Sequence, residues 1–492
     1  MEWQNPISIT RSITDAISAY EEDDGLLVGK WQNLTEFYNN LPAKLPWHWL
    51  GSDEILEEFS ENNGRKVAYG QCWVFACLLT TILRFLGVPS RPVTIFRAGH
   101  DSNFDVVITM VIKDDQTLNV TMSESLWNFH VWTEAWIRRI DLNPSNGSQY
   151  DGWQILDSTP QIKINNKYQI GPVPKYAIYN ADVFLNKETC FIYCTVNCDV
   201  HYVSQQGDIL GVESTLVGRA FMTKSIGFGE NRMADITHTY KDPEGSVQER
   251  TKFNRARAIS LRNKRVLHVS QTREINFSLS HQQFIIEIEC AHWAMIGEPV
   301  KAKIFLVNYS NKNVYFNIYL EINSMYYSGE IAKTIFDQAL HYELKAKKYL
   351  EITVALTPEE YLKKLVPFSI VQFQVVAHNY NTSQILVKTH RLIFVKPELR
   401  VTADKNVLVG QNFSVQISLT NFLRNTLTDC KIKIRGLRIG SITIEVESIK
   451  PKEKRVLKFN FKSANRGTET IMALFSSKQL DHLTGEAQIN II

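Results

Sequence analysis

The spacing of apolar and polar residues divides the chain into two unlike parts. Beyond about residue 280, short segments alternate apolar and polar positions, a period of two that is typical of strands with one buried face. Clear examples are residues 284–289, 300–306, 314–320, 369–375 and 413–419. Because Pro397-Glu398 interrupts this series, the pattern predicts two successive antiparallel β domains of the immunoglobulin-like sandwich or barrel kind.

The first 250 residues mix helical and strand patterns. An apolar run opens at Gly70, and Gly87 and Pro89 follow it as helix-ending signals, so a helix is predicted between them. Strict alternation predicts a strand over residues 126–132, and a second strand is expected over residues 152–157. Residues 190–197 also have a strand-like composition. This part of the chain is therefore expected to be α+β.

Composition narrows the class of protein. The chain has 54 Lys and Arg against 51 Asp and Glu, a net charge of +3, which argues against nucleic acid as its main partner. No apolar run reaches the roughly 18 residues of a membrane span, and the first thirty residues carry no secretory signal pattern. Seven cysteines without a CxxC pair predict neither a disulfide scaffold nor a cysteine zinc site. We expect a reducing, cytoplasmic environment.

A basic stretch joins the two parts. Residues 250–273 contain eight Lys or Arg and no Asp or Glu. An anionic docking surface is one interpretation, but a solvated helix or linker is the simpler one. The predicted organisation is a catalytic core over residues 1–250, a basic linker over 251–280, a first β domain over 281–397 and a second over 398–492.

Cys72 lies in the first turn of the predicted helix. Unpaired backbone N–H groups and the positive end of the helix dipole stabilise a thiolate there, and the same backbone can donate to an oxyanion. A single cysteine is more often a small buried hydrophobe, so Cys72 alone predicts no chemistry.

His130 and Asp157 change that interpretation. They lie on the two predicted strands, and neighbouring strands can bring the carboxylate against the imidazole. Taken singly, His130 would be a half-buried residue among aromatic side chains, and Asp157 a turn former at a strand end. A helix-borne cysteine with a strand-borne histidine and a carboxylate from the next strand is a papain-like arrangement. Together the three residues predict a catalytic triad with a cysteine nucleophile.

At this point the chain resembles the animal transglutaminases of the factor XIII A-chain and tissue type. The likeness covers nearly the whole chain. Its most specific motifs are Tyr69-Gly-Gln-Cys-Trp-Val-Phe75, Trp127-Asn-Phe-His130, Gly152-Trp-Gln-Ile-Leu-Asp-Ser-Thr-Pro160 and Asp235-Ile-Thr-His-Thr-Tyr240. The resemblance implies a papain-like core and two C-terminal β domains. It also implies an N-terminal β-sandwich, which we expect to be absent because core-like sequence begins by about residue 11.

The resemblance implies an activity and a set of residues. The expected reaction is calcium-dependent protein-glutamine γ-glutamyl transfer, which forms isopeptide crosslinks to Lys or other primary amines through a cysteine thioester, with deamidation as a side reaction. Cys72, His130 and Asp157 fall on the family triad. Trp31 falls on the tryptophan whose indole completes the oxyanion hole, and Trp127 on the second wall of the substrate tunnel. Tyr327 falls on a regulatory tyrosine that hydrogen-bonds the resting cysteine.

The expected cofactor is Ca²⁺, at sites that the resemblance also implies. The first choice matches the family's best-known calcium site: Asn197, Asp199, Glu244 and Glu249. The second choice matches a loop whose occupancy opens the tunnel, and its oxygen spacing suits a hard cation: Asp101, Asn103, Asp105 and Glu124. A weaker candidate is the acidic run of residues 21–24.

Two other readings stay open. A papain-like cysteine hydrolase or protease would use the same triad, and a non-catalytic structural member of the family would share the fold.

The expected partners are glutamine-donor and lysine or amine-acceptor proteins. Regulation by GTP is not expected, because Glu287 and Glu289 stand where the nucleotide-binding strand of the tissue enzyme carries arginines and would repel phosphate. Relatives reach extracellular targets without a leader, so release from the cell also stays open.

Overall fold

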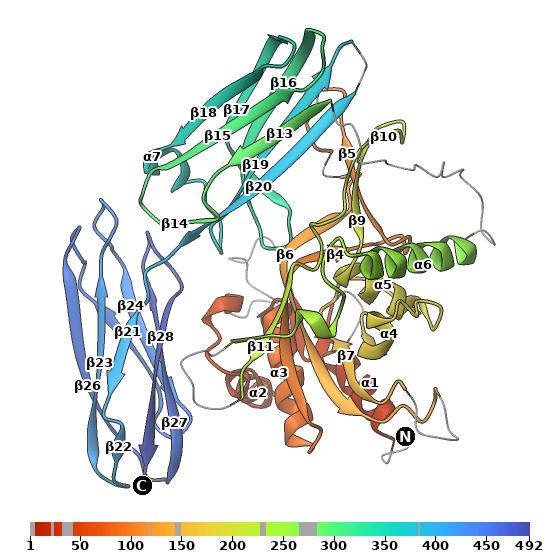
Figure 1. Ribbon diagram of the computed structural model, residues 1–492. Helices are drawn as coiled ribbons and strands as arrows, with labels where there is room; N and C mark the ends of the chain where they lie inside the picture. Colours follow the sequence, from red (N-terminus) through yellow and green to blue (C-terminus); the bar gives the residue numbers. More distant parts are fainter. Residues whose placement is uncertain are drawn as a thin grey trace.

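Three bodies of secondary structure follow one another along the chain (Figure 1). The computed structural model describes residues 5–20, 24–31, 43–115, 117–119, 121–142, 149–226, 233–264, 283–381 and 384–492. A core of mixed helices and strands comes first, and two all-β domains follow it, one above the core and one beside it in Figure 1. The predicted fold class, an α+β core followed by two immunoglobulin-like β domains, is confirmed.

The core contains six α-helices among the described residues. They are α1 (Pro6–Ile17), α2 (Ser52–Glu61), α3 (Cys72–Phe85), α4 (Lys175–Tyr179), α5 (Lys187–Val196) and α6 (Val247–Lys264). Its strands are β1 (Ser18–Ala19), β2 (Leu27–Gly29), β3 (Val67–Gly70), β4 (Ser90–His100), β5 (Val107–Ile112), β6 (Ser125–Ile137), β7 (Gly152–Asp157), β8 (Ile170–Pro174), β9 (Asp199–Ser204), β10 (Ile209–Glu213), β11 (Ala220–Lys224) and β12 (Met233–Asp235). Two short 3₁₀ helices, Pro46–His48 and Thr237–Thr239, complete it.

A six-stranded sheet with α3 against it forms the centre of the core. The strand order is β12-β11-β4-β6-β7-β8, and α3 packs on β4 and β6. The predicted helix is confirmed, and Gly87, with φ of +83°, follows its end as expected for a residue that leaves a helix in the left-handed conformation. The predicted strands over 126–132 and 152–157 are also confirmed, as β6 and β7.

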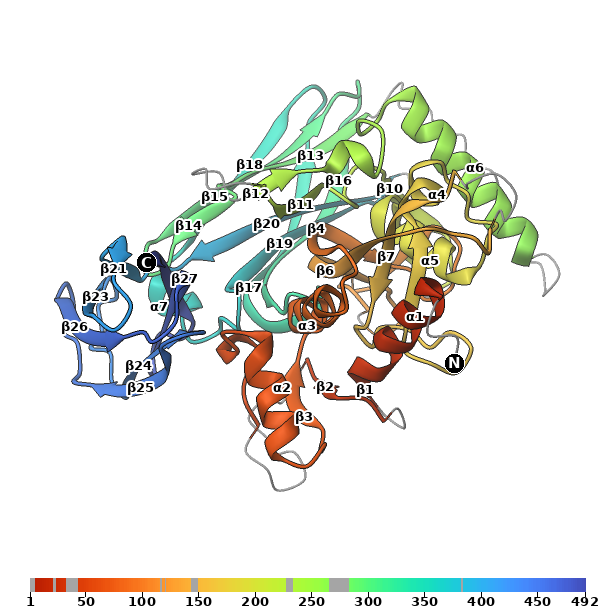
Figure 2. The ribbon, with the colours of Figure 1, turned by 90° about the horizontal axis from the view of Figure 1, so that it is seen from below.

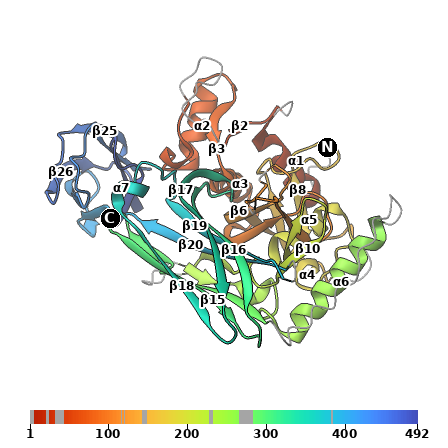
Figure 3. The ribbon, with the colours of Figure 1, turned by 90° about the horizontal axis from the view of Figure 1, so that it is seen from above.

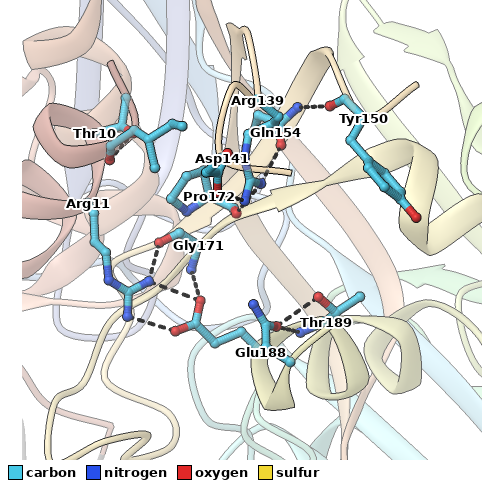
Figure 4. Close-up of polar contacts among 12 residues, drawn as sticks. Thr10, Arg11, Arg139, Asp141, Tyr150, Gln154, Gly171, Pro172, Glu188 and Thr189 are labelled. Atoms are coloured by element: carbon cyan, nitrogen blue, oxygen red, sulfur yellow. Dashed lines mark hydrogen bonds and ion pairs between the residues drawn. The ribbon is translucent and has the colours of Figure 1, made fainter. Parts of the chain in front are cut away.

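Ion pairs and carbonyl contacts hold the outer strand β8 beside β7. The Arg11 guanidinium donates to the Gly171 carbonyl at 2.7 Å and to Glu188 at 2.8 Å, and Glu188 accepts from the Gly171 N–H at 2.8 Å (Figure 4). On the other side of this strand, Arg139 donates to the carbonyl of Pro172 and to the side chain of Gln154. These contacts fix the edge of the sheet next to the strand that ends in Asp157.

The strand-like reading of residues 190–197 is wrong, because this segment is the helix α5. Asn186 caps the helix by accepting from the Thr189 N–H at 2.8 Å. Every residue from Glu188 to Val196 is buried. A helix buried on all sides shows no polar face, so its β-branched and aromatic residues imitate the composition of a buried strand.

The segment predicted as a basic linker begins inside α6. This helix continues through Lys264, and Phe253 and Ala256 are buried against the core. Its basic residues pair with core carboxylates: Lys252 with Asp242 at 2.6 Å and Arg255 with Asp182 at 2.8 Å. The remainder of the predicted linker, residues 265–282, lies outside the described part of the chain, and the proposed domain boundaries stay predictions.

Each β domain is a sandwich of a three-stranded and a five-stranded sheet. The first contains β13 (Phe284–Glu289), β14 (Trp293–Met295), β15 (Val300–Asn308), β16 (Val314–Met325), β17 (Ile331–Leu344), β18 (Tyr349–Leu356), α7 (Pro358–Tyr361), β19 (Ile370–Asn379) and β20 (Ile385–Val395). The second contains β21 (Arg400–Ala403), β22 (Asn406–Val407), β23 (Asn412–Thr420), β24 (Cys430–Gly436), β25 (Gly440–Val446), β26 (Lys454–Lys462), β27 (Gly467–Ser476) and β28 (Leu483–Ile491). Inward-facing apolar side chains of the paired sheets fill both interiors.

Both β domains contact the core. Asn128 of β6 donates its N–H to the Tyr327 carbonyl at 2.7 Å, which joins the catalytic strand to the turn between β16 and β17. The second β domain meets α2, where Lys433 pairs with Glu54 at 2.8 Å and Arg435 with Asp53 at 2.5 Å. Figure 2 shows α2 on the side of the core toward this domain, and Figure 3 shows α6 on the opposite side.

Candidate active site

The start of α3 presents Cys72 in the interior of the core. Cys72 is the first residue of the helix and is fully buried. Gln71 precedes it without capping the helix through its side chain, which donates instead to the Lys30 carbonyl at 3.0 Å. The residue before the helix therefore caps none of the first helical N–H groups with its side chain, as the sequence predicted for a site that stabilises negative charge.

His130 and Asp157 form a short hydrogen bond between adjacent strands. The His130 Nε2 atom lies 2.6 Å from Asp157 Oδ2, and both side chains are buried. The second carboxylate oxygen accepts from the Thr159 N–H at 2.9 Å. The Nδ1 atom of His130 has no hydrogen-bond partner of ordinary geometry within the described residues, which leaves it available to the cysteine.

The surroundings of His130 favour the imidazolium. Burial by itself lowers the pKa of His130, but the charge and hydrogen bond of Asp157, followed by the Cys72 side chain, raise this pKa to about 10. These surroundings therefore favour the protonated form of the histidine, which lies against the Cys72 side chain. A protonated imidazole beside a thiolate is the resting form of papain-like nucleophiles.

Gln161 is a polar residue of this site that the sequence reasoning missed. Its Nε2 atom donates to Asp157 Oδ2 at 2.5 Å and lies 3.0 Å from His130 Nε2. It follows directly after the motif that contains Asp157, so its place in the sequence was the available signal. Because Gln161 donates to the same Asp157 oxygen that His130 contacts, it holds this oxygen in place.

Both predicted oxyanion donors converge on one oxygen atom. Trp31 Nε1–H donates to the Tyr327 hydroxyl at 2.5 Å, and the Cys72 N–H donates to the same oxygen at 3.4 Å. The hydroxyl also hydrogen-bonds the Cys72 side chain, and burial raises the pKa of Tyr327 well above its usual range, which keeps it neutral. The Tyr327 oxygen therefore stands where two donors would meet a developing oxyanion. Tyr326 contributes only its carbonyl, to Asn128.

Aromatic rings surround this group. The ring centroids of Trp31 and Trp127 are 6.3 Å apart, and Trp127 stacks on His100 at 5.8 Å. Tyr327 packs edge-on against Trp127 at 5.6 Å. The structure thus brings together all six residues predicted for the triad, the tunnel and the resting contact.

The first predicted calcium set is gathered, but around two cationic side chains of the chain itself. Lys241 Nζ donates to the Val217 carbonyl at 2.9 Å and to Glu244 at 2.5 Å, and it lies 3.5 Å from Asn197 Oδ1. Arg250 binds the remaining two members, donating to both oxygens of Glu249 at 2.5 Å and to Asp199 at 2.7 Å. Sequence reasoning missed both basic residues, because Lys241 lies three positions before Glu244 and Arg250 directly after Glu249, where neither could be told from a solvated charge.

Three members of the second predicted set, Asp101, Asn103 and Asp105, lie in the loop between β4 and β5, and Glu124 lies directly before β6. Asp101 is fully buried, and among the described residues it accepts from the backbone N–H groups of Asn103 at 3.0 Å and Val106 at 2.8 Å. Burial, together with the charges of Asp105 and Glu124, raises the pKa of Asp101 to about 7. Burial also raises the pKa of Glu124, against the hydrogen bonds that it accepts from Thr109 and Ser102. These carboxylates therefore repel one another.

Neither set is arranged as a finished metal site. Within the described ranges, no group of three or more His, Cys, Asp or Glu side chains is close enough to hold a metal ion. Of the acidic run at residues 21–24, only Asp24 lies in the described part of the chain, where it is 3.4 Å from Lys66.

Comparison with known proteins agrees with this geometry. Residues 46–158 match the Transglutaminase-like superfamily, and residues 284–388 and 397–491 match the C-terminal ig like domain of the Transglutaminase family. The red sea bream transglutaminase crystal structure superimposes with a TM-score of 0.81 at 24 % identity, over 99 % of this chain and 69 % of that one. At this identity the likeness shows the fold alone.

Two enzymes are similar over nearly the full chain. The hemocyte protein-glutamine gamma-glutamyltransferase of Tachypleus tridentatus is 32 % identical over 99 % of this chain, and the human protein-glutamine gamma-glutamyltransferase K is 32 % identical over 99 %. This chain spans 63 % and 58 % of their lengths.

Among the described helices, none is both long and apolar enough to cross a membrane.

Proposed function

The chain belongs to the transglutaminase family, and from this premise we propose that it is a calcium-dependent protein-glutamine γ-glutamyltransferase. One observation carries the proposal more than any other. Trp31 Nε1–H and the Cys72 N–H meet at a single oxygen beside the cysteine, which is the arrangement that stabilises an acyl-transfer oxyanion. His130, held by Asp157, supplies the general acid and the general base that acyl transfer from an amide requires.

The first half of the reaction is acylation of the enzyme. The Cys72 thiolate attacks the γ-carboxamide carbon of a protein glutamine, and the carbonyl oxygen becomes an oxyanion that replaces the Tyr327 hydroxyl between the two donors. Each such donor typically contributes about 3–4 kcal/mol to the barrier reduction. His130 then gives its proton to the leaving nitrogen, and ammonia departs as the oxyanion collapses to a thioester. Asp157 and Gln161 hold the imidazole in position throughout.

The second half transfers the acyl group to an amine. His130, now neutral, takes a proton from a lysine ε-amine as its nitrogen attacks the thioester carbon. Collapse of this second tetrahedral intermediate releases the Cys72 thiolate and an isopeptide bond, and the imidazolium is restored. Water in place of the amine gives deamidation. The indoles of Trp31 and Trp127 favour the amine, because they desolvate the butyl stem of an approaching lysine.

Calcium enters this proposal first through the loop that contains Asp101. Hard oxygen ligands at spacings of two residues suit Ca²⁺, and a bound cation would relieve the repulsion that Asp105 and Glu124 exert on Asp101. When bound, Ca²⁺ would supply that positive charge and fix the loop. Glu124 lies directly before β6, the strand of Trp127 and His130, so ordering of the loop bears on the tunnel.

We propose a second calcium site that can fill only when Lys241 is displaced. Its ligands would be Asn197, Asp199, Glu244 and Glu249. Its oxygens already surround cationic atoms, which supports their ability to bind one. Ca²⁺ would have to displace Lys241 from Glu244 and Asn197, so we expect weaker binding here than at the loop.

Substrates and regulation follow from the same reasoning. We expect glutamine-donor and amine-acceptor proteins as partners, in the cytoplasm or after release without a leader. Regulation by GTP is not expected, because Glu287 and Glu289 of β13 are exposed carboxylates at the position of the nucleotide contacts in the tissue enzyme.

The decisive experiment is incorporation of a fluorescent primary amine into a glutamine-rich protein, with calcium and with excess chelator. We expect incorporation only with calcium, and none in Cys72→Ala, whose small side chain preserves the helix. Cys430→Ala, which removes a buried cysteine of the second β domain, serves as the matched control. Residual incorporation in Cys72→Ala would remove that residue from the mechanism. Peptide-bond cleavage without amine incorporation would instead identify a cysteine protease, and no turnover at all a structural protein.

A further inference from the structure

A cavity of about 510 Å³ lies between the core and the first β domain. The indoles of Trp31 and Trp127 form part of its wall, so it opens directly onto the proposed tunnel. The opposite wall belongs to β19 and β20 and is polar. Gln372 pairs across these two strands with Arg391, and Gln374 with Thr389, which places the four side chains on one face of the sheet, toward the cavity.

Arg391 is a buried cation without an anionic partner among the described residues. Its guanidinium donates to Gln372 Oε1 at 3.0 Å, Asn128 Oδ1 at 2.6 Å and the Leu126 carbonyl at 3.2 Å, and all three acceptors are neutral. A guanidinium has five N–H groups, so donors remain for a further acceptor. Burial and the nearby charge of Arg97 lower the pKa of Arg391 well below its usual range, which reflects an uncompensated charge. Such buried charges are normally paired.

Gln374 gives a second, independent sign of a missing acceptor. Its side chain is buried, and its Nε2 donor has no hydrogen-bond partner in the part of the chain that the structure describes. A buried amide without a partner is costly, and native proteins seldom leave one without a reason. An orphaned donor one cross-strand pair away from an unpaired guanidinium fits an anionic ligand.

The remaining charged side chains of the cavity have the opposite sign. Glu124 and Glu330 lie in its wall, on the core and on the turn after Tyr327. A ligand whose carboxylate meets Arg391, and whose methylene chain crosses the indoles toward the Cys72 thioester, matches the cationic side of this cavity. A neutral or purely cationic amine would leave Arg391 unpaired.

We propose that this cavity selects acyl-acceptor amines that also bear a carboxylate a few carbons from the nitrogen, with Arg391 and Gln374 binding the carboxylate. The inference rests on the proposed transferase function and adds a substrate preference to it. The chemical class is an ω-amino acid, or a lysine with a free or side-chain carboxylate next to it. Arg391 prefers carboxylates for the planar, two-point contact that its guanidinium offers.

The test compares two acceptors that differ only in this group, 5-aminopentanoate and 5-aminopentanamide. The full chain with calcium and a glutamine-donor peptide is used, and the ratio of their kcat/KM values is measured together with ammonia release. We expect wild type to favour the carboxylate about 10-fold, as one charge-assisted contact provides. Gln374→Glu should lower that ratio at least 10-fold, because the new carboxylate pairs with Arg391 and repels the ligand.

Two further variants make the result specific. Gln338→Glu introduces the same charge change on exposed β17 of the same sheet and should keep the wild-type ratio. Arg391→Met should bring the ratio near one. Because the ratio compares the two acceptors with the same variant, it can be measured even if the overall activity falls. Equal use of both acceptors by wild type, or a ratio that neither Gln374→Glu nor Arg391→Met alters, would overturn this inference alone. Failure to transfer either acceptor would overturn the transferase proposal with it.

Discussion

Asp157 and Asp101 are both buried carboxylates of the core, and the chain neutralises them differently. Asp157 accepts from His130 at 2.6 Å and Gln161 at 2.5 Å, and the imidazole that it faces has its pKa raised to about 10. In the described part of the chain, Asp101 accepts from backbone N–H groups and lies near the like charges of Asp105 and Glu124. Within the described residues, a cationic partner is therefore present for Asp157 but not for Asp101. We infer that catalysis is preassembled and that the loop depends on an added cation.

The largest expected effect comes from removing the charge of the neutralised carboxylate. Asp157→Asn keeps the shape but no longer raises the pKa of His130, so the imidazolium is lost at a lower pH. We expect kcat/KM for amine incorporation to fall by about 10³–10⁴-fold, as in other triads. The pH profile of amine incorporation should lose its alkaline limb at a lower pH than in wild type, because the imidazolium that protonates the leaving ammonia is lost there. Superimposable pH profiles would show that Asp157 does not act on the histidine.

The next prediction removes one charge from the loop. Asp105→Asn keeps the acceptor that binds the Val107 N–H but relieves repulsion on Asp101 and Glu124. In chelator, the variant should be more stable than wild type, with a Tm higher by a few degrees for about 1 kcal/mol. It should also need about 10-fold more calcium for half-maximal activity, since one anionic ligand is missing. A lower Tm in chelator would contradict the repulsion, and an unchanged calcium requirement would contradict the site.

A smaller effect should distinguish the loop from the set that carries its own cations. Lys241→Met removes the ammonium that holds Glu244 and Asn197, so calcium no longer has to displace it. We expect half-maximal activation at several-fold lower calcium. Lys252→Met breaks a comparable pair with Asp242 outside this set and should leave the calcium titration unchanged. Identical titrations for both variants and wild type would mean that the Lys241 set does not respond to calcium.

The smallest effect concerns access to the preassembled centre. Tyr327→Phe removes the oxygen that accepts from Trp31 and the Cys72 N–H but preserves the ring packing on Trp127. Alkylation of Cys72 by iodoacetamide in chelator should be several-fold faster, because the hydroxyl no longer blocks the sulfur. Tyr326→Phe is the control, since only its main chain contacts the site. Equal rates in wild type and Tyr327→Phe would remove the proposed cap.

Local sequence was most informative where neighbouring residues carry the signal. The helix that begins at Cys72 and the strands of His130 and Asp157 follow from apolar periodicity and from Gly87 and Pro89. The alternating strands after residue 280 likewise identify two β domains. The same reasoning was wrong for α5, because a helix buried on every side has no polar face to set its period.

What the sequence by itself determined is the set of chemical groups and the elements that bear them: a cysteine at a helix start, a histidine and an aspartate on strands, and the family to which their motifs belong. Only the tertiary structure decided which charges neutralise which. The contact of Lys241 with Asn197 and the pairing of Arg250 with Asp199 join segments far apart in the chain. Within the described residues, the side chains that surround Arg391 also come from distant segments, and none of its hydrogen-bond acceptors is an acid. Coulomb energies depend on distance and burial, and neither can be read from sequence separation.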